Sequence, residues 1–193
     1  MPSLSGQHLN LWKKGLGQVP DSVWAQTELE TLVLADNGLC EVSERIGELR
    51  RLRMLDLGHN QLTSVPEVLG EIELLSDFLY LHDNRLSSLP EALARLKKLR
   101  YLNISGNEFV CFPECVCEMA GLIELRVTDN LLTSMPDSIG QLSRLRELHL
   151  RNNKLATLPE AVGELRELRQ IDLRESLGFA AGVSCVAAAV GED

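Results

Sequence analysis

Residues 52–75 read LRMLDLGHNQLTSVPEVLGEIELL, and residues 76–98 repeat the same arrangement of leucine, asparagine and proline as SDFLYLHDNRLSSLPEALARLKK. Aligned on the asparagine, the pattern recurs at spacings of 23, 24, 23, 23 and 23 residues. The recurring asparagines are Asn37, Asn60, Asn84, Asn107, Asn130 and Asn153. A fixed period of this length indicates a solenoid of stacked units, each of which needs its neighbours to bury a core.

The first half of each unit predicts a strand followed by a hydrogen-bonded turn. Apolar residues stand eight, five and three places before each asparagine, except that Ser76 takes the first of these places before Asn84. The last two alternate with other residues, as on a short strand with one buried face, and successive strands of this kind pair into a parallel sheet. Asparagine both donates and accepts hydrogen bonds, so the stacked asparagines are predicted to form a ladder that satisfies buried backbone groups.

The second half of each unit returns the chain to the start of the next strand. Proline stands six places after five of the asparagines, where it removes a backbone donor and fixes φ. A small residue ten places after the asparagine allows neighbouring turns to approach closely. This place holds Gly47, Gly70, Ala94, Cys117, Gly140 and Gly163. Size therefore explains Cys117, and the segment CFPECVC, with Cys111 and Cys115, is not predicted to bind a metal.

The consensus LxxLxLxxNxLxxLPxxLGxLxx resembles the 23-residue repeat of intracellular leucine-rich repeat (LRR) proteins. That class includes the plant Ras-group-related, Scribble-type and many bacterial LRR proteins. The resemblance implies an α/β fold: a curved right-handed horseshoe solenoid with a parallel β-sheet on its concave face and short helical or irregular segments on its convex face. It extends over about residues 6–175.

The repeat frame divides residues 1–175 into an array of about eight units and leaves an apolar tail at 176–193. The predicted units are 6–28, 29–51, 52–75, 76–98, 99–121, 122–144, 145–167 and a partial unit at 168–175. The first is degenerate, with Lys14 in the place of the asparagine, and Ser176 takes that place at the other end. The tail is either an apolar helix that closes the stack or an incidental segment after a shortened array. The 24-residue spacing predicts a local bulge just before Phe78.

Composition restricts the partner and the compartment. A net charge of -9 argues against nucleic acid, because phosphate binding needs a basic face, and against an anionic membrane surface. No secretory signal is visible at the N-terminus, and the longest apolar run has 14 residues, too short to span a bilayer. Five cysteines without a framework spacing favour a reducing compartment. We therefore expect a cytoplasmic, monomeric protein that binds neither nucleic acid nor membrane.

Residues that alternate with the inward leucines should form columns along the concave face. An aromatic patch on three neighbouring strands comprises Met54, Phe78, Tyr80, His82 and Tyr101. Exposed aromatic residues and methionine are typical of protein-binding hot spots, so we interpret this patch as a partner-binding site. The alternative is that the rings only pack on each other and shield the sheet.

Beyond Tyr101 the predicted face becomes charged. Arg126, His149 and Arg151 lie there among acidic residues, where they either fix the register of a partner or form mutual ion pairs on a solvated face. His59 and His82 fall on adjacent strands but in different places of the repeat, so no shared metal site is predicted.

No motif predicts catalysis: the chain contains no phosphate-binding loop, no GxSxG and no HExxH. The sequence therefore predicts a protein-interaction module without enzymatic activity or cofactor, which binds a protein on the concave face. Two alternatives remain. The chain is the recognition part of a larger signalling protein or enzyme with a kinase, GTPase or ligase domain, or it regulates a Ras-like GTPase, as the resemblance to the Ras-group class implies.

Overall fold

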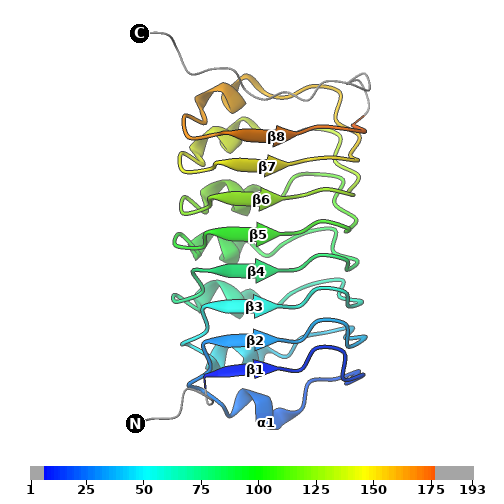
Figure 1. Cartoon of the computed structure of the whole chain (residues 1–193), viewed down its shortest axis with the longest axis vertical. Coiled ribbons are helices and arrows are strands. Elements are labelled where there is room, and N and C mark those ends of the chain that lie inside the picture. The colour runs from blue at the N-terminus through cyan, green and yellow to red at the C-terminus, as the bar shows by residue number, and fades with distance from the viewer. Residues whose placement is uncertain (1–6, 177–193) are drawn as a thin grey trace.

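The computed structural model describes residues 7–176, which form one open parallel sheet with short helices on a single side (Figure 1). All eight strands pair in parallel with their neighbours in chain order, so β1 and β8 are the two edges. The strands are β1 (His8–Asn10), β2 (Thr31–Val33), β3 (Met54–Asp56), β4 (Phe78–Tyr80), β5 (Tyr101–Asn103), β6 (Glu124–Arg126), β7 (Glu147–His149) and β8 (Gln170–Asp172). This is the fold class that the repeat predicts.

Each return segment contains one short helix that begins directly after the predicted proline place. The helices are α1 (Asp21–Trp24) and the 3-10 helices η2 (Glu44–Glu48), η3 (Glu67–Glu71), η4 (Glu91–Arg95), η5 (Glu114–Glu118), η6 (Asp137–Gln141) and η7 (Glu160–Glu164). Proline is the residue before every helix except η2, where Ser43 stands instead and its side chain accepts a hydrogen bond from the Arg45 backbone. Both residues suit a helix start. Proline has no backbone N–H that needs a hydrogen-bond partner, and the serine side chain accepts a hydrogen bond from a free backbone N–H of the first turn.

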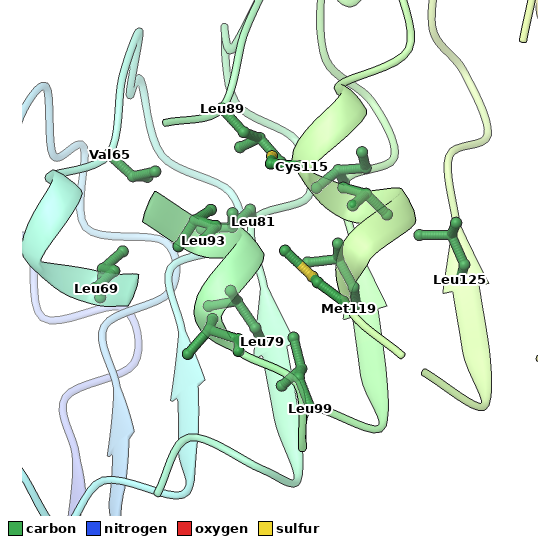
Figure 2. Packing of buried hydrophobic residues seen from close by; sticks show 14 of the residues in the cluster. Val65, Leu69, Leu79, Leu81, Leu89, Leu93, Leu99, Cys115, Met119 and Leu125 are labelled. Atoms are coloured by element: carbon green, nitrogen blue, oxygen red, sulfur yellow. The ribbon is translucent and has the colours of Figure 1, made fainter. Parts of the chain in front are cut away.

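The core lies between the sheet and these helices and is continuous along the stack. Figure 2 shows Leu79 and Leu81 of the β4 repeat, together with Leu93 of η4 and Met119 of the following repeat, all within this layer. These four side chains are fully buried. Because each repeat fills the space beneath its neighbour, stability depends on stacking rather than on any single unit.

Two cysteines belong to this core and behave as apolar residues. Cys115 and Cys117 are each 1% exposed. Burial raises the pKa of the Cys115 thiol to about 12 and also raises that of Cys117. Thiolates are the metal-binding form of cysteine, so these two thiols are poor ligands at neutral pH.

The recurring asparagines hydrogen-bond from one repeat to the next. The Nδ2 of Asn107 lies 3.0–3.1 Å from the carbonyl oxygens of Leu81, Ile104 and Ser105, and its Oδ1 accepts from the Leu86 backbone at 2.9 Å. The same kinds of bond occur at Asn37, Asn60, Asn84, Asn130 and Asn153. At the C-terminal end the Ser176 hydroxyl donates to the Leu150 carbonyl at 3.2 Å, the position that asparagine serves elsewhere.

The extra residue of the 24-residue repeat lies just before β4, as the spacing predicts. The structure corrects one detail: Leu75, not Ser76, takes the first apolar place, because Leu75 is 1% exposed and Ser76 is only half-buried. In a regular repeat, the backbone N–H of Arg53 donates to the carbonyl of Glu30, the residue directly before β2. The equivalent N–H of Arg100 donates instead to the carbonyl of Ser76, which lies two residues before β4. The insertion is thus absorbed in the segment between Leu75 and Phe78.

Apart from Ser176, the predicted tail at 176–193 lies outside the described residues. Between residues 7 and 176 no helix is long and apolar enough to cross a membrane.

Candidate binding surface

The face of the sheet turned away from the helices carries the predicted columns, and we call it the open face. Register pairs Met54 with Phe78 and Phe78 with Tyr101, so these residues lie in one row across β3, β4 and β5. Tyr80 lies in the next row, between Asp56 and Asn103. Strand pairing therefore brings the predicted aromatic patch together.

Four side chains on and after β4 and β5 form what we call the aromatic cluster: Phe78, Tyr80, His82 and Tyr101. The rings of Phe78 and Tyr80 are nearly parallel, with centroids 5.9 Å apart. Tyr101 contacts both, at 5.5 Å from Phe78 and 5.0 Å from Tyr80, and His82 meets Tyr80 edge-on at 5.9 Å. The rings thus pack on each other, yet Phe78 remains 43% exposed.

An open groove of about 420 Å³ runs beside this cluster, at the N-terminal ends of the strands. Its lining residues are Arg53, Asp77, Phe78, Arg100, Tyr101, Ile123 and Glu124. Arg53 donates two hydrogen bonds to the Asp77 carboxylate, at 3.1 and 3.3 Å. The groove therefore combines an aromatic wall with charged groups of both signs.

The charged end of the open face is internally paired. Arg126 donates to Glu124 at 2.6 Å and Arg151 to Glu175 at 2.9 Å. His149 is only 7% exposed and its Nε2 lies 3.3 Å from Glu147. The open-face column does not predict this burial, which leaves His149 little surface for a partner. This arrangement favours the interpretation of mutual ion pairs over direct recognition at these three residues.

The geometry just described occurs in a chain whose sequence matches two family models. A model of the leucine-rich repeat region matches residues 77–178, and a leucine rich repeat model matches residues 51–72. The chain belongs to the leucine-rich repeat family.

Solved LRR structures resemble this chain over most of its length. An LRR protein of Leptospira interrogans gives a TM-score of 0.68 and 26% identity over 88% of this chain. The LRR ectodomain of the Arabidopsis thaliana membrane receptor kinase GASSHO1/SCHENGEN3, in complex with CASPARIAN STRIP INTEGRITY FACTOR 2, gives 0.74 and 29% over 82%. The plant peptide hormone receptor RGFR1, in complex with RGF2, gives 0.71 and 29% over 82%.

This LRR chain is shorter than those structures, since it spans 55%, 20% and 26% of the three chains respectively. No curated protein matches it.

The LRR frame did not reveal one group of side chains. His59, His82 and Asp83 come close together in the turns after β3 and β4, although His82 occupies a different place of the repeat from His59 and Asp83. The sequence signal that could have revealed this group is Gly58, which occupies the same place in its repeat as His82 does in the next one. Because glycine has no side chain, it leaves room for the His82 ring.

The two tyrosines of this LRR chain, Tyr80 and Tyr101, both lie in the aromatic cluster, so phenol ionisation reports on this site alone. Burial raises the pKa of Tyr80 and raises that of Tyr101 to about 12. In an ultraviolet titration we expect Tyr101 to ionise near pH 12 in the native protein, and both tyrosines near the ordinary value of about 10 in concentrated guanidinium chloride. Because the unfolded phenol loses its proton first, the free energy of unfolding falls as pH rises from about 10 towards 12. Native tyrosines that both titrate at the ordinary value would contradict the packing.

Proposed function

We propose that this LRR chain is a non-catalytic interaction module that binds a protein or peptide on its open face, with the aromatic cluster as the anchor. The observation that carries the proposal is the exposure of Phe78, at 43%, on rings that are already packed. A side chain held in place before binding loses little conformational freedom when a partner covers it. The contact area of the ring is then available for affinity.

Two further observations support this function. The groove beside Phe78 and Tyr101 offers apolar walls with charged groups at its border, the arrangement of a hot spot with a polar rim. The receptors GASSHO1/SCHENGEN3 and RGFR1 carry bound partners in the structures that resemble this chain. By similarity, we expect a peptide or an extended segment of a protein as the partner here.

The test is affinity purification with the full chain, followed by mass spectrometry and a binding measurement on the captured partner. Replacing Phe78 and Tyr80 together by alanine should weaken binding about 30-fold or more, because a hot-spot residue contributes about 2 kcal/mol or more. The thermal melt should change little, since neither side chain belongs to the buried core: Phe78 is exposed and Tyr80 is half-buried on the open face.

Trp12→Ala is the matched control, because Trp12 is an exposed aromatic residue, 56% accessible, near the far end of the sheet from the cluster. It should leave partner binding unchanged. If the double variant binds as well as the wild type, or if Trp12→Ala abolishes binding instead, the aromatic cluster is not the anchor.

A second proposal concerns the context of the module. One of the structures that this chain resembles is the LRR ectodomain of a membrane receptor kinase. By similarity, we propose that the LRR array serves as the recognition part of a larger signalling protein. Transcripts that join this reading frame to a kinase, GTPase or ligase domain would support it, and transcripts that encode the LRR array alone would contradict it.

The cysteines support a reducing compartment such as the cytoplasm. Cys40, Cys111, Cys115 and Cys117 are all free thiols within the described residues, and two of them are exposed. We therefore propose a cytoplasmic protein of the 23-residue LRR class, which localisation of the tagged full chain tests directly. Accumulation outside the cell would overturn this assignment.

A further inference from the structure

Three side chains with metal-binding atoms meet at one point on the rim of the open face, in the turns that follow β3 and β4. Donor atoms from His59, His82 and Asp83 all lie within 4.8 Å of one another. We propose that these three residues bind a divalent transition-metal ion, with Zn²⁺ as the best match. The proposal goes beyond the protein-binding function above, with which it shares only His82, and metal binding is measured without a protein partner.

The backbone aims two of the donors at the same point. His59 and Asp83 occupy equivalent places in consecutive repeats, and both have the left-handed backbone conformation, with φ of 52°. The His59 backbone donates to the His82 carbonyl at 2.9 Å, which holds the two turns together. As a result, Nδ1 of His59 lies 3.3 Å from the Asp83 carboxylate oxygen Oδ2.

Two glycines make room for the other donor groups. A Cβ on Gly58 would overlap the His82 imidazole, so the glycine allows this ring to lean towards β3. A Cβ on Gly106 would overlap the Asp83 carboxylate in the same way. The His59 and His82 rings then meet edge to face, with centroids 4.8 Å apart and an angle of 81°. Side chains at these two positions would prevent the cluster.

The distances fit a tetrahedral ion after small adjustments. Zn–N bonds of about 2.0–2.1 Å and Zn–O bonds of about 2.0–2.2 Å place two ligand atoms about 3.3 Å apart. The His59–Asp83 pair already has this separation, and the His82 donor needs to approach by at most about 1.5 Å from the upper limit of 4.8 Å, which a change of side-chain torsion supplies. Three protein ligands leave the fourth position open to water or to a group from a partner.

The chemistry of the donors also fits. Two imidazoles and one carboxylate suit Zn²⁺ better than they suit Ca²⁺ or Mg²⁺, which prefer oxygen ligands. Within the described residues, Nδ1 of His82 is buried and makes no hydrogen bond, and an ion coordinated by this nitrogen would give it a partner. Burial lowers the pKa of His82, which favours the neutral imidazole that binds metals.

A second cluster in the described part of the chain shows what distinguishes this one. Glu124, Glu147 and His149 also have donor atoms within 4.8 Å of one another. There, however, the Arg126 guanidinium donates to Glu124 at 2.6 Å, so a cation already neutralises the carboxylate. The described residues show no such cation on Asp83, whose ion-pair partner is His59 itself.

The experiment is calorimetric titration of the full chain with ZnCl₂, after iodoacetamide has alkylated the exposed thiols of Cys40 and Cys111. We expect one site whose affinity falls at least tenfold in His59→Asn and in His82→Asn. Asparagine tolerates the left-handed backbone at position 59, and circular dichroism checks that each variant is folded. Asp83→Asn provides a second test with almost no change of shape and should show the same loss.

His8→Asn and His149→Asn are the matched controls, because they remove histidines of the same sheet from outside the cluster. Both should bind Zn²⁺ as the wild type does. Three outcomes overturn the proposal: no zinc binding by the wild type, equal binding by all variants, or a loss confined to His149→Asn.

Discussion

Asn107→Ala is expected to lower the free energy of unfolding by about 3 to 5 kcal/mol, one of the two largest effects that the structure predicts. The side chain bonds to three carbonyl oxygens from two repeats and accepts from the Leu86 backbone. Alanine supplies neither donors nor acceptors, and each unsatisfied buried group costs about 1–3 kcal/mol. Water can compensate only partly, because Asn107 is 8% exposed.

Urea unfolding followed by circular dichroism measures this change, and Asn103→Ala is its control. Asn103 belongs to the same repeat but lies on the open face, where its Oδ1 accepts one hydrogen bond from Ser105. Its loss should cost about 1 kcal/mol. If the two variants are equally stable, the asparagine ladder contributes no more than an ordinary surface hydrogen bond.

The repeat predicts the sheet because a strand of period 2 and a unit of constant length allow only one register between neighbouring strands. Once Asn60, Asn84 and Asn107 are aligned, Met54, Phe78 and Tyr101 must fall side by side, and the strand pairing has this register. The aromatic row therefore follows from counting residues. The proline place found by the same counting lies directly before each short helix, and before η2 Ser43 occupies it.

Contacts between different places of the repeat could not be predicted in this way. His82 reaches His59 because Gly58 lacks a side chain, and this depends on the ring direction rather than on the register. Leu75, rather than Ser76, takes the core place, because burying a leucine side chain stabilises the fold by about 2 kcal/mol relative to leaving it exposed. Counting residues back from the asparagine does not include this energy. The burial of His149 likewise depends on how the neighbouring side chains pack around it. The repeat frame assigns His149 to the open face but does not predict this packing.

The insertion before β4 and the aromatic cluster are adjacent in the chain. Leu75 keeps its core place, so the extra length falls on the two residues before Phe78. One of them, Asp77, pairs with Arg53 at the edge of the groove. The irregular spacing thus coincides with the part of the open face that we propose as the partner-binding site.

Gly70→Ala, in η3, is the second large expected effect, a loss of about 1 to 3 kcal/mol in the free energy of unfolding. A Cβ at this position would overlap the backbone carbonyl group of Ala92, which belongs to the next 3-10 helix. Backbone atoms cannot rotate away as a side-chain end can, so η3 and η4 would have to separate. Such a separation would disturb the stacking on which the core depends.

Gly163→Ala is the matched control, because Gly163 has the same place in its repeat and a Cβ there meets no atom of the described residues within 4 Å. Alanine loses less conformational freedom on folding than glycine does, so this variant should be as stable as the wild type or more stable by up to about 1 kcal/mol. Thermal and urea unfolding of both variants measure the difference. A Gly70→Ala protein as stable as Gly163→Ala would show that the turns can separate at no cost. The small-residue requirement would then be a matter of chain flexibility rather than of close packing between repeats.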